Sequence, residues 1–276
     1  QTTLNEGIKM VDGAEQILEG HSKRFRYIMV HRTGKIEILG IKDNKFIMKY
    51  HPAKDKENLN KIMKEASEKF NAIELTNSMR KPVIGIVGEI FMRDNAFCNG
   101  GLIKKLEDLG AETVMGPFHE WLIYSTYRYT RDSLWKSDYR GLLKSQIQKY
   151  SQKISHWNIH RQVKQHIDTE KEVHLHDILT LCNDYVHKDY DGDPPIAMGT
   201  AASLAKKRVS GIANILPFTC MPGTLICSLS NTFREDHENI PWVDIAYDGQ
   251  DDIGIDTRLQ AFMHQAQEFA KAKGYG

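Results

Sequence analysis

The stretch that decides the fold is "PVIGIVGEIFMRDNAFCNGGLIKKLEDLG", residues 82–110. It opens with a continuous apolar run, residues 82–90, which is typical of a strand buried on both faces of a parallel sheet. Apolar side chains then recur at helical spacing over residues 100–109, and Gly110 is a typical helix stop. The next run, "AETVMGPF", predicts a second strand. The order strand, helix, strand indicates a parallel sheet.

The same alternation continues to the end of the chain. The predicted helices cover residues 139–167, 169–185, 196–208, 224–234 and 256–272, and the predicted further strands cover residues 210–218 and 241–249. Apolar residues repeat at steps of three and four in the long segment 139–167, which predicts an amphipathic helix. We therefore expect an α/β domain over residues 80–276, with a Rossmann-like parallel sheet and helices on both of its faces.

The first part of the chain has a different pattern. Residues 25–51 contain three short β-rich runs, separated by the turn-forming pairs Thr33-Gly34 and Asp43-Asn44. This predicts an antiparallel meander, and a helix is expected over residues 54–70. The polar stretch before residue 80 suggests a boundary, so residues 1–79 are predicted to form a small α+β segment.

Composition restricts the classes of partner and compartment. Thirty-seven basic residues oppose 36 acidic ones, and a net charge of +1 favours neither nucleic acid nor an anionic membrane as a partner. No apolar run approaches the roughly 20 residues that span a bilayer. The first residues lack the features of a signal peptide, and we expect the chain to be part of a longer protein. Four cysteines without a CxxC pair argue against a disulfide scaffold or zinc ribbon and favour the cytoplasm.

Three polar loops follow predicted strands, at residues 88–101, 217–224 and 245–256. Loops after the carboxyl ends of parallel strands line the ligand crevice of such sheets, so all three are expected to face one cleft. The candidate ligand-binding residues are Glu89, Arg93, Asn95, Asn99, Glu120 and Asp248. Two glycines before the first helix suggest an anion site at its amides. Alternatively, the asparagines only cap that helix, Arg93 and Glu89 form a surface pair, and Glu120 is an exposed helix cap instead of a general acid or base.

The cysteines in these loops have two interpretations. Cys220 is expected at the start of a helix, where the helix dipole favours a thiolate that could act as a nucleophile or a metal ligand. A lone cysteine is more often a small core residue, and Cys227, inside the same predicted helix, fits that description better. No histidine lies near Cys220 in the sequence to activate it as a nucleophile.

Four motifs together resemble a known family. In sequence order they are "GIVGEIFMRDNAFCNGGLIKKLEDLGAE", "EWLIY", "GIANILPFTCMPGT" and "IAYDGQDD...RLQAFMHQA". The set, spanning about residues 80–275, resembles the carboxyl-terminal region of large activase-related proteins of the 2-hydroxyacyl-CoA dehydratase family. The resemblance implies that the characteristic positions are Glu89, Arg93, Asn95, Cys220, Pro222, Gly223, Asp248, Gly249 and Arg258. One departure is "DGDPPIAMG", in which Asp193 stands in place of a glutamate, so the role of that carboxylate is in doubt.

The resemblance also implies a function. The chain would be a module that supports iron-sulfur-dependent electron transfer or acyl-CoA dehydration, with dehydratase or activator subunits and acyl-CoA as partners, and could form a homodimer. Cys98 and Cys220 would be the thiolate ligands of the cluster, and two ligands are too few for a four-iron cluster unless other groups complete the set. The alternative is a non-redox module whose crevice binds an anionic ligand or a partner protein. Whether the chain is an enzyme stays open.

Overall fold

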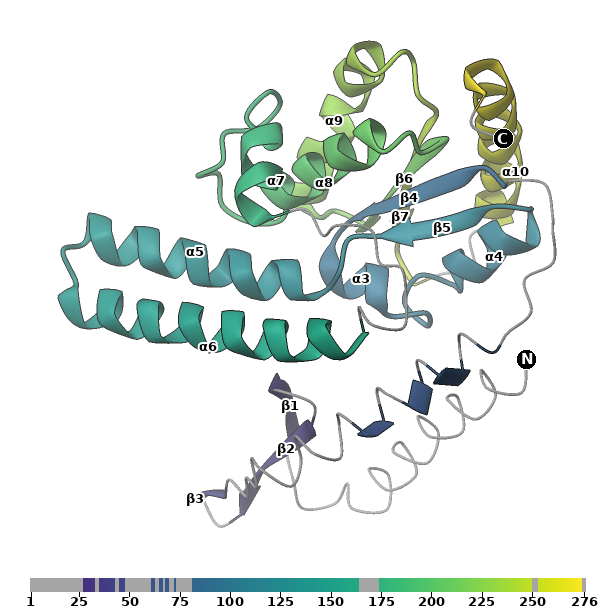
Figure 1. The fold of residues 1–276 in the computed structure, drawn as a ribbon. Helices are drawn as coiled ribbons and strands as arrows, with labels where there is room; N and C mark the ends of the chain where they lie inside the picture. The colour runs from purple at the N-terminus through teal and green to yellow at the C-terminus, as the bar shows by residue number, and fades with distance from the viewer. Residues whose placement is uncertain are drawn as a thin grey trace. The chain divides into compact units, whose positions relative to one another are not determined.

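The structure is a computed structural model, and the part of the chain that it describes is discontinuous (Figure 1). The described residues are 27–32, 35–42, 45–47, 61, 62, 65, 66, 68, 69, 72, 81–163, 174–249 and 253–274. The chain divides into two compact units. The first unit contains residues 1–74 and 154–169, and the second contains residues 75–153 and 170–276.

The first unit contains an antiparallel meander. Its strands are β1 (Tyr27–Arg32), β2 (Lys35–Lys42) and β3 (Lys45–Ile47), in the order β1-β2-β3. Both pairings are antiparallel, which confirms the meander predicted for residues 25–51. Of the helix predicted over residues 54–70, six residues between 61 and 69 are described and all are helical, while the remainder lies outside the described residues.

The second unit is built around a four-stranded parallel sheet. Its strands are β4 (Val83–Gly88), β5 (Glu112–Met115), β6 (Gly211–Pro217) and β7 (Trp242–Tyr247), in the order β5-β4-β6-β7. β4 pairs in parallel with both β5 and β6, and β6 pairs in parallel with β7. The chain thus leaves β4 toward β5 and leaves β6 in the opposite direction, toward β7. Such a reversal next to the carboxyl ends of parallel strands is where α/β sheets form their binding crevice.

Helices cover both faces of this sheet. The helices that follow β4 along the chain are α3 (Ile90–Asp94), α4 (Leu102–Asp108), α5 (His119–Trp135), α6 (Tyr139–Val163), α7 (Leu175–Cys182), α8 (Pro194–Lys206), α9 (Met221–Asp236) and α10 (Ile253–Lys273). Val87 and Ile212 point to an apolar cluster with side chains from α5, α7, α8 and α9. Ile84 and Ile86 belong to a second cluster with side chains from α3, α4 and α10. The α/β class with helices on both faces is therefore confirmed.

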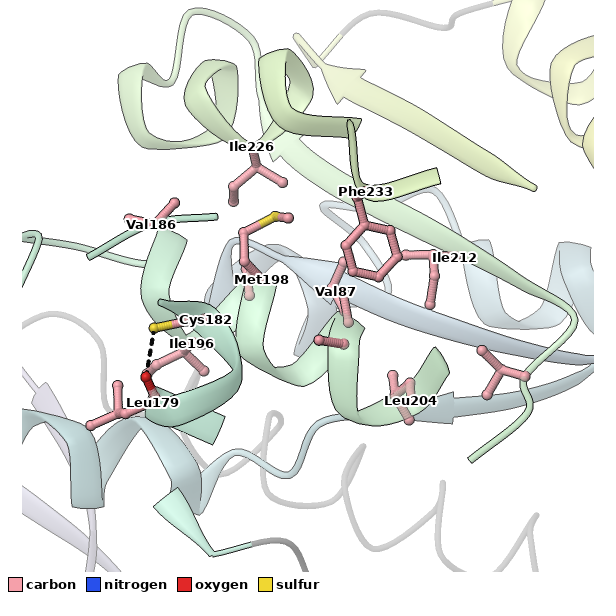
Figure 2. Close-up of a cluster of buried hydrophobic side chains, with 14 of the residues drawn as sticks. Val87, Leu179, Cys182, Val186, Ile196, Met198, Leu204, Ile212, Ile226 and Phe233 are labelled. Atoms are coloured by element: carbon pink, nitrogen blue, oxygen red, sulfur yellow. Dashed lines mark hydrogen bonds between the residues drawn. The ribbon is translucent and has the colours of Figure 1, made fainter. Parts of the chain in front are cut away.

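The first of these clusters forms the larger core beside the crevice (Figure 2). Phe233 on α9 is fully buried and contacts the ring of Tyr185, with ring centroids 5.2 Å apart. Met198 on α8 and Ile226 on α9 are also buried, and Figure 2 shows both in the same cluster as Val87. Burial of such side chains supplies most of the driving force for folding, so α8 and α9 are held firmly against the sheet.

Helix α6 begins at Tyr139 as predicted, but its apolar stripe is not its packing face. Leu143, Ile147 and Tyr150 are each more than 60% exposed. The helix instead approaches α5 through small residues, because a Cβ atom on Gly141 would lie 2.6 Å from Ser133 Oγ. Small side chains permit close helix packing, so the sequence period located the helix but not its buried face. Within the described part of the chain, no helix has the length and apolar character needed to cross a membrane.

Candidate functional site in the second unit

A cluster of charged side chains lies where the strands β4 and β5 end. Glu89 follows β4 directly and is the N-cap of α3, where its Oε2 accepts a hydrogen bond from the Met92 amide at 2.7 Å. Arg93 lies one turn farther along α3 and is 3% exposed. Glu120, in the first turn of α5 after β5, is 8% exposed. Charged side chains are rarely buried to this extent unless they are paired, so the cluster needs an explanation.

Arg93 is the most unusual of these groups. Its Nε and Nη1 atoms are buried and have no hydrogen-bond partner among the described residues. Burial lowers the pKa of Arg93 below its ordinary value, although the carboxylates of Glu120, Asp94, Asp193 and Glu89 act in the opposite direction. Each buried N–H group without an acceptor costs about 1–3 kcal/mol. The fold therefore keeps a guanidinium with two free donor atoms at an energetic cost.

One of the unpaired donor atoms of Arg93, Nη1, lies near two other side chains above Gly116. A Cβ atom on Gly116 would lie 3.0 Å from Arg93 Nη1, 3.0 Å from Glu120 Oε2 and 3.1 Å from Thr200 Cγ2. Since both atoms lie 3.0 Å from that Cβ position, the distance between Arg93 Nη1 and Glu120 Oε2 is at most twice 3.0 Å. The Thr200 hydroxyl, on α8, donates a hydrogen bond to Glu120 Oε2 at 3.3 Å. Glycine at position 116 avoids the close contacts that a Cβ atom would make with these three side chains.

Asp193 adds a titratable carboxyl group beside the cluster. It is the N-cap residue of α8, and its side chain makes no capping hydrogen bond. Burial, together with the negative charge of Glu89, raises its pKa to about 6, and Arg93 opposes this shift. A carboxyl group with this pKa changes protonation near neutral pH and can exchange a proton with a bound ligand.

Carboxylates outnumber cations in this cluster. The four acidic groups whose charges act on Arg93 are those of Glu120, Asp94, Asp193 and Glu89. The field at this cluster is therefore negative, while the unpaired donor atoms belong to the guanidinium. A ligand that satisfies both requirements carries an acceptor for Arg93 and a cationic or donor group for the carboxylates.

The two asparagines predicted as ligand-binding residues have structural roles. Asn95 Oδ1 accepts hydrogen bonds from the amides of Phe97 and Cys98, at 3.0 and 3.1 Å. Asn99 is buried, and its Nδ2 donates to Met92 O at 2.8 Å.

Asn99 Oδ1 accepts from the Gly101 and Leu102 amides, which are the groups that the anion site at this helix start would need. These bonds give Asn99 the capping role of the alternative expectation, and the anion site at the amides of this helix start stays a prediction. The alternative of a surface pair between Arg93 and Glu89 is wrong, because Arg93 is buried.

Asp248 lies at a different strand end from this cluster. Asp248 directly follows β7, which is two strands away from β4 in the sheet. The loop that it begins still adjoins the other two predicted loops, because a Cβ atom on Gly100 would lie 3.8 Å from Tyr247 Cε1 and the Phe218 amide donates a hydrogen bond to Tyr247 O at 2.8 Å. The loop after β6 is closer, because a Cβ atom on Gly192, next to Asp193, would lie 3.6 Å from Pro222 Cγ.

The predicted cluster ligands do not form a metal site with the other described residues. Cys98 is half-buried and packs against the apolar cluster of α3, α4 and α10. Cys220 is half-buried at the N-cap of α9, as expected from its sequence. Among the described residues, no group of three or more histidine, cysteine, aspartate or glutamate side chains could hold a metal ion. Since an iron-sulfur cluster needs about four such ligands, the described residues do not fit one.

The comparisons with known proteins give one partial match. A protein of Aquifex aeolicus (strain VF5), named as a putative L-lysine 2,3-aminomutase, is 44% identical to the chain over 62 residues. The match covers 22% of this chain and 17% of that protein. No family model matches the chain, and no solved structure matches it.

These findings overturn the resemblance to the 2-hydroxyacyl-CoA dehydratase family. That prediction was wrong, because no family model supports it and the partial match is to a differently named protein. The motifs that carried it are explained in part by the fold, since Asn95 and Asn99 shape the loop after α3. The partners that it implied stay predictions.

Two residues of the site were not found by sequence reasoning. Neither Gly116 nor Thr200 has a motif around it: Gly116 directly follows β5, and Thr200 joins the cluster because α8 packs against β4. The sequence signal for Asp193 was its place directly before two prolines, which are the first two residues of α8.

The remaining cysteines are predicted to be unreactive. Burial raises the pKa of Cys182 to about 11, and its thiol donates to Leu179 O at 3.1 Å. Burial, with the neighbouring charge of Asp244, raises the pKa of Cys227 to about 12. At pH 8 we expect iodoacetamide to alkylate both at least about 100-fold more slowly in the folded protein than in urea. Peptide mass spectrometry over a time course measures the two alkylation rates. Equal rates in the folded protein and in urea would contradict the prediction that these cysteines are unreactive.

Proposed function

We propose that the crevice of the second unit binds a small ligand that carries both a carboxylate and an amine. The observation that supports this most directly is the pair of unsatisfied donor atoms, Nε and Nη1, on the buried side chain of Arg93. A carboxylate is the natural acceptor for a guanidinium because it can bind two of its N–H groups at once. The ligand's carboxylate would thus remove the cost of the unpaired donors.

The acidic groups of the crevice provide the second part of the proposal. An anion alone would meet the field of Glu89, Glu120 and Asp193, which opposes its binding. An ammonium group on the same ligand would be attracted by that field and could donate hydrogen bonds to a carboxylate. Amino acids carry both groups. The name of the partial relative refers to L-lysine, so L-lysine is the first probe.

Proton exchange by Asp193 gives the proposed binding a pH dependence. The pKa of this group is raised to about 6, so it is mostly ionised at pH 7 and mostly neutral at pH 5. Its negative charge attracts the ligand's ammonium group, and we expect the affinity for L-lysine to fall as the pH is lowered from 7 to 5. Asp193→Asn is expected to bind weakly at both values, without this change.

Isothermal titration calorimetry with three matched probes tests the proposal. L-Lysine carries both groups, hexanoate lacks the amines, and pentane-1,5-diamine lacks the carboxylate. We expect L-lysine to bind and each of the other two to bind at least about tenfold more weakly, since hexanoate loses both ammonium groups and pentane-1,5-diamine loses the carboxylate. Hexanoate binding as tightly as L-lysine would contradict the role of the carboxylates, and no heat with L-lysine would contradict the proposal for this amino acid.

A further inference from the structure

A separate cavity lies within the second unit, away from Arg93. It has a volume of about 590 Å³ and is lined by residues of α5, α6 and α7 and by Lys188 and Asp189. Small-molecule sites in proteins commonly have volumes of about 300–1,000 Å³ and mostly apolar walls with a few polar groups. Apolar and aromatic side chains on its wall include Ile123, Tyr127, Leu134, Trp135 and Leu175. The cavity therefore has the size and the lining of a ligand site.

The acidic group on the wall of this cavity is already paired. Asp189 lies 3.5 Å from the Nη1 atom of Arg131 and accepts a hydrogen bond from the Tyr127 hydroxyl at 3.2 Å. Arg131 is also engaged, because it donates to Asp132 and Asp191, and its guanidinium lies 4.7 Å from the centre of the Trp135 ring. These contacts stiffen one wall, and the opposite charges of the two lining residues Arg131 and Asp189 offset each other.

Two lysines give the cavity a positive rim. Lys149 on α6 and Lys188 after α7 both line the cavity and are exposed. Among the ion pairs of the described residues, neither ammonium group has a carboxylate partner. The paired Asp189 does not neutralise them, so the open side of an apolar cavity carries uncompensated positive charge.

We propose that this cavity binds a small amphipathic anion, with its apolar or aromatic body against Tyr127, Leu134 and Leu175 and its anionic end at Lys149 and Lys188. Burial of the apolar body provides the affinity, and the two lysines select an anionic over a neutral end group. The proposal concerns a different site from the crevice of Arg93 and does not depend on the function proposed there.

Fluorescence of 8-anilinonaphthalene-1-sulfonate, which has an aromatic body and a sulfonate, tests the proposal with the whole chain. We expect saturable enhancement and displacement of the dye by decanoate but not by decanol. The double variant Lys149→Gln with Lys188→Gln should weaken dye binding by about tenfold. The matched control, Lys144→Gln with Lys153→Gln, removes two exposed charges from α6 outside the cavity and should change it by less than about twofold.

Two further variants locate the dye. Thr180 lines the cavity and is exposed, so Thr180→Trp can fill the space without disturbing a buried contact and should abolish the enhancement. Ile147→Ser removes part of the exposed apolar stripe of α6 and should leave the enhancement unchanged. Loss of the signal in Ile147→Ser, or an equal effect of the two lysine pairs, would overturn the proposal. Circular dichroism confirms that each variant is folded.

Discussion

Replacing Asp193 with asparagine is expected to raise the free energy of unfolding at pH 7 by up to about 3 kcal/mol. The folded protein raises the pKa of this carboxyl group from 3.8 to about 6, chiefly by burial. At pH 7 the group must therefore be ionised in a place that disfavours the charge. Asparagine keeps the shape without the charge, and no capping hydrogen bond is lost because the Asp193 side chain makes none.

The sign of the pH dependence follows from the same shift. Because the folded pKa is higher than the unfolded one, the folded state of the wild type binds more protons between pH 4 and 6, and stability falls as the pH rises through that window. Urea unfolding at pH 4, 5, 6 and 7 should show the two proteins diverging with rising pH.

Asp191→Asn is the matched control for this prediction. The Arg131 side chain donates a hydrogen bond to Asp191 and lowers the pKa of Asp191. The negative charge of Asp191 should therefore contribute slightly to stability. This variant is expected to be slightly less stable than the wild type at pH 7. A loss of stability in Asp193→Asn at pH 7 would contradict the burial of an ionised Asp193.

Gly88→Ala is expected to cost more than about 4 kcal/mol, which is a large part of the stability of a typical domain. Gly88 ends β4 with a φ of +110°, and a Cβ atom there would lie 2.0 Å from Ile215 O and 2.7 Å from Asn214 Oδ1. The first contact is with the backbone of β6, which cannot move without breaking the pairing of β4 with β6. Glu89 and Arg93 would lose their positions with it.

Gly249→Ala separates the effect of close contact from that of backbone conformation. Gly249 also has a positive φ, of +84°, but a Cβ atom there would have nothing within 4 Å. We expect a cost of about 1–2 kcal/mol for this variant, from the left-handed conformation alone. Thermal unfolding and soluble yield compare Gly88→Ala with Gly249→Ala. Similar losses of stability in the two variants would contradict a large cost of the contact between position 88 and β6.

The strands of the parallel sheet could be predicted from the sequence, but the burial of the charged side chains beside it could not. Buried parallel strands are continuous apolar runs, so β4 and β6 were predictable from local pattern alone. Helix α5, which contains Glu120, was not predicted, and it packs Glu120 against Thr200 from a helix 80 residues away. Burial of Arg93 depends on these long-range contacts, which leave no periodic signal in the sequence.

Polar residues in the loop after β4 were correctly identified as important, but their roles could not be separated in advance. Asn99 and Arg93 are both polar and both buried. The difference is that both polar atoms of the Asn99 side chain have backbone partners, whereas Arg93 keeps two donors without one. Only hydrogen-bond geometry shows which residue completes the fold and which is left for a ligand.

The most direct test of the proposed site is calorimetric titration of L-lysine into the wild type and into Arg93→Met at pH 7, with thermal unfolding of both. Because burial lowers the pKa of Arg93 despite its acidic neighbours, its charge is a cost to folding, and methionine should fold at least as stably. We expect the variant to lose L-lysine binding by at least about 100-fold while its melting temperature does not fall. Binding of L-lysine by Arg93→Met within about twofold of the wild type would contradict the account.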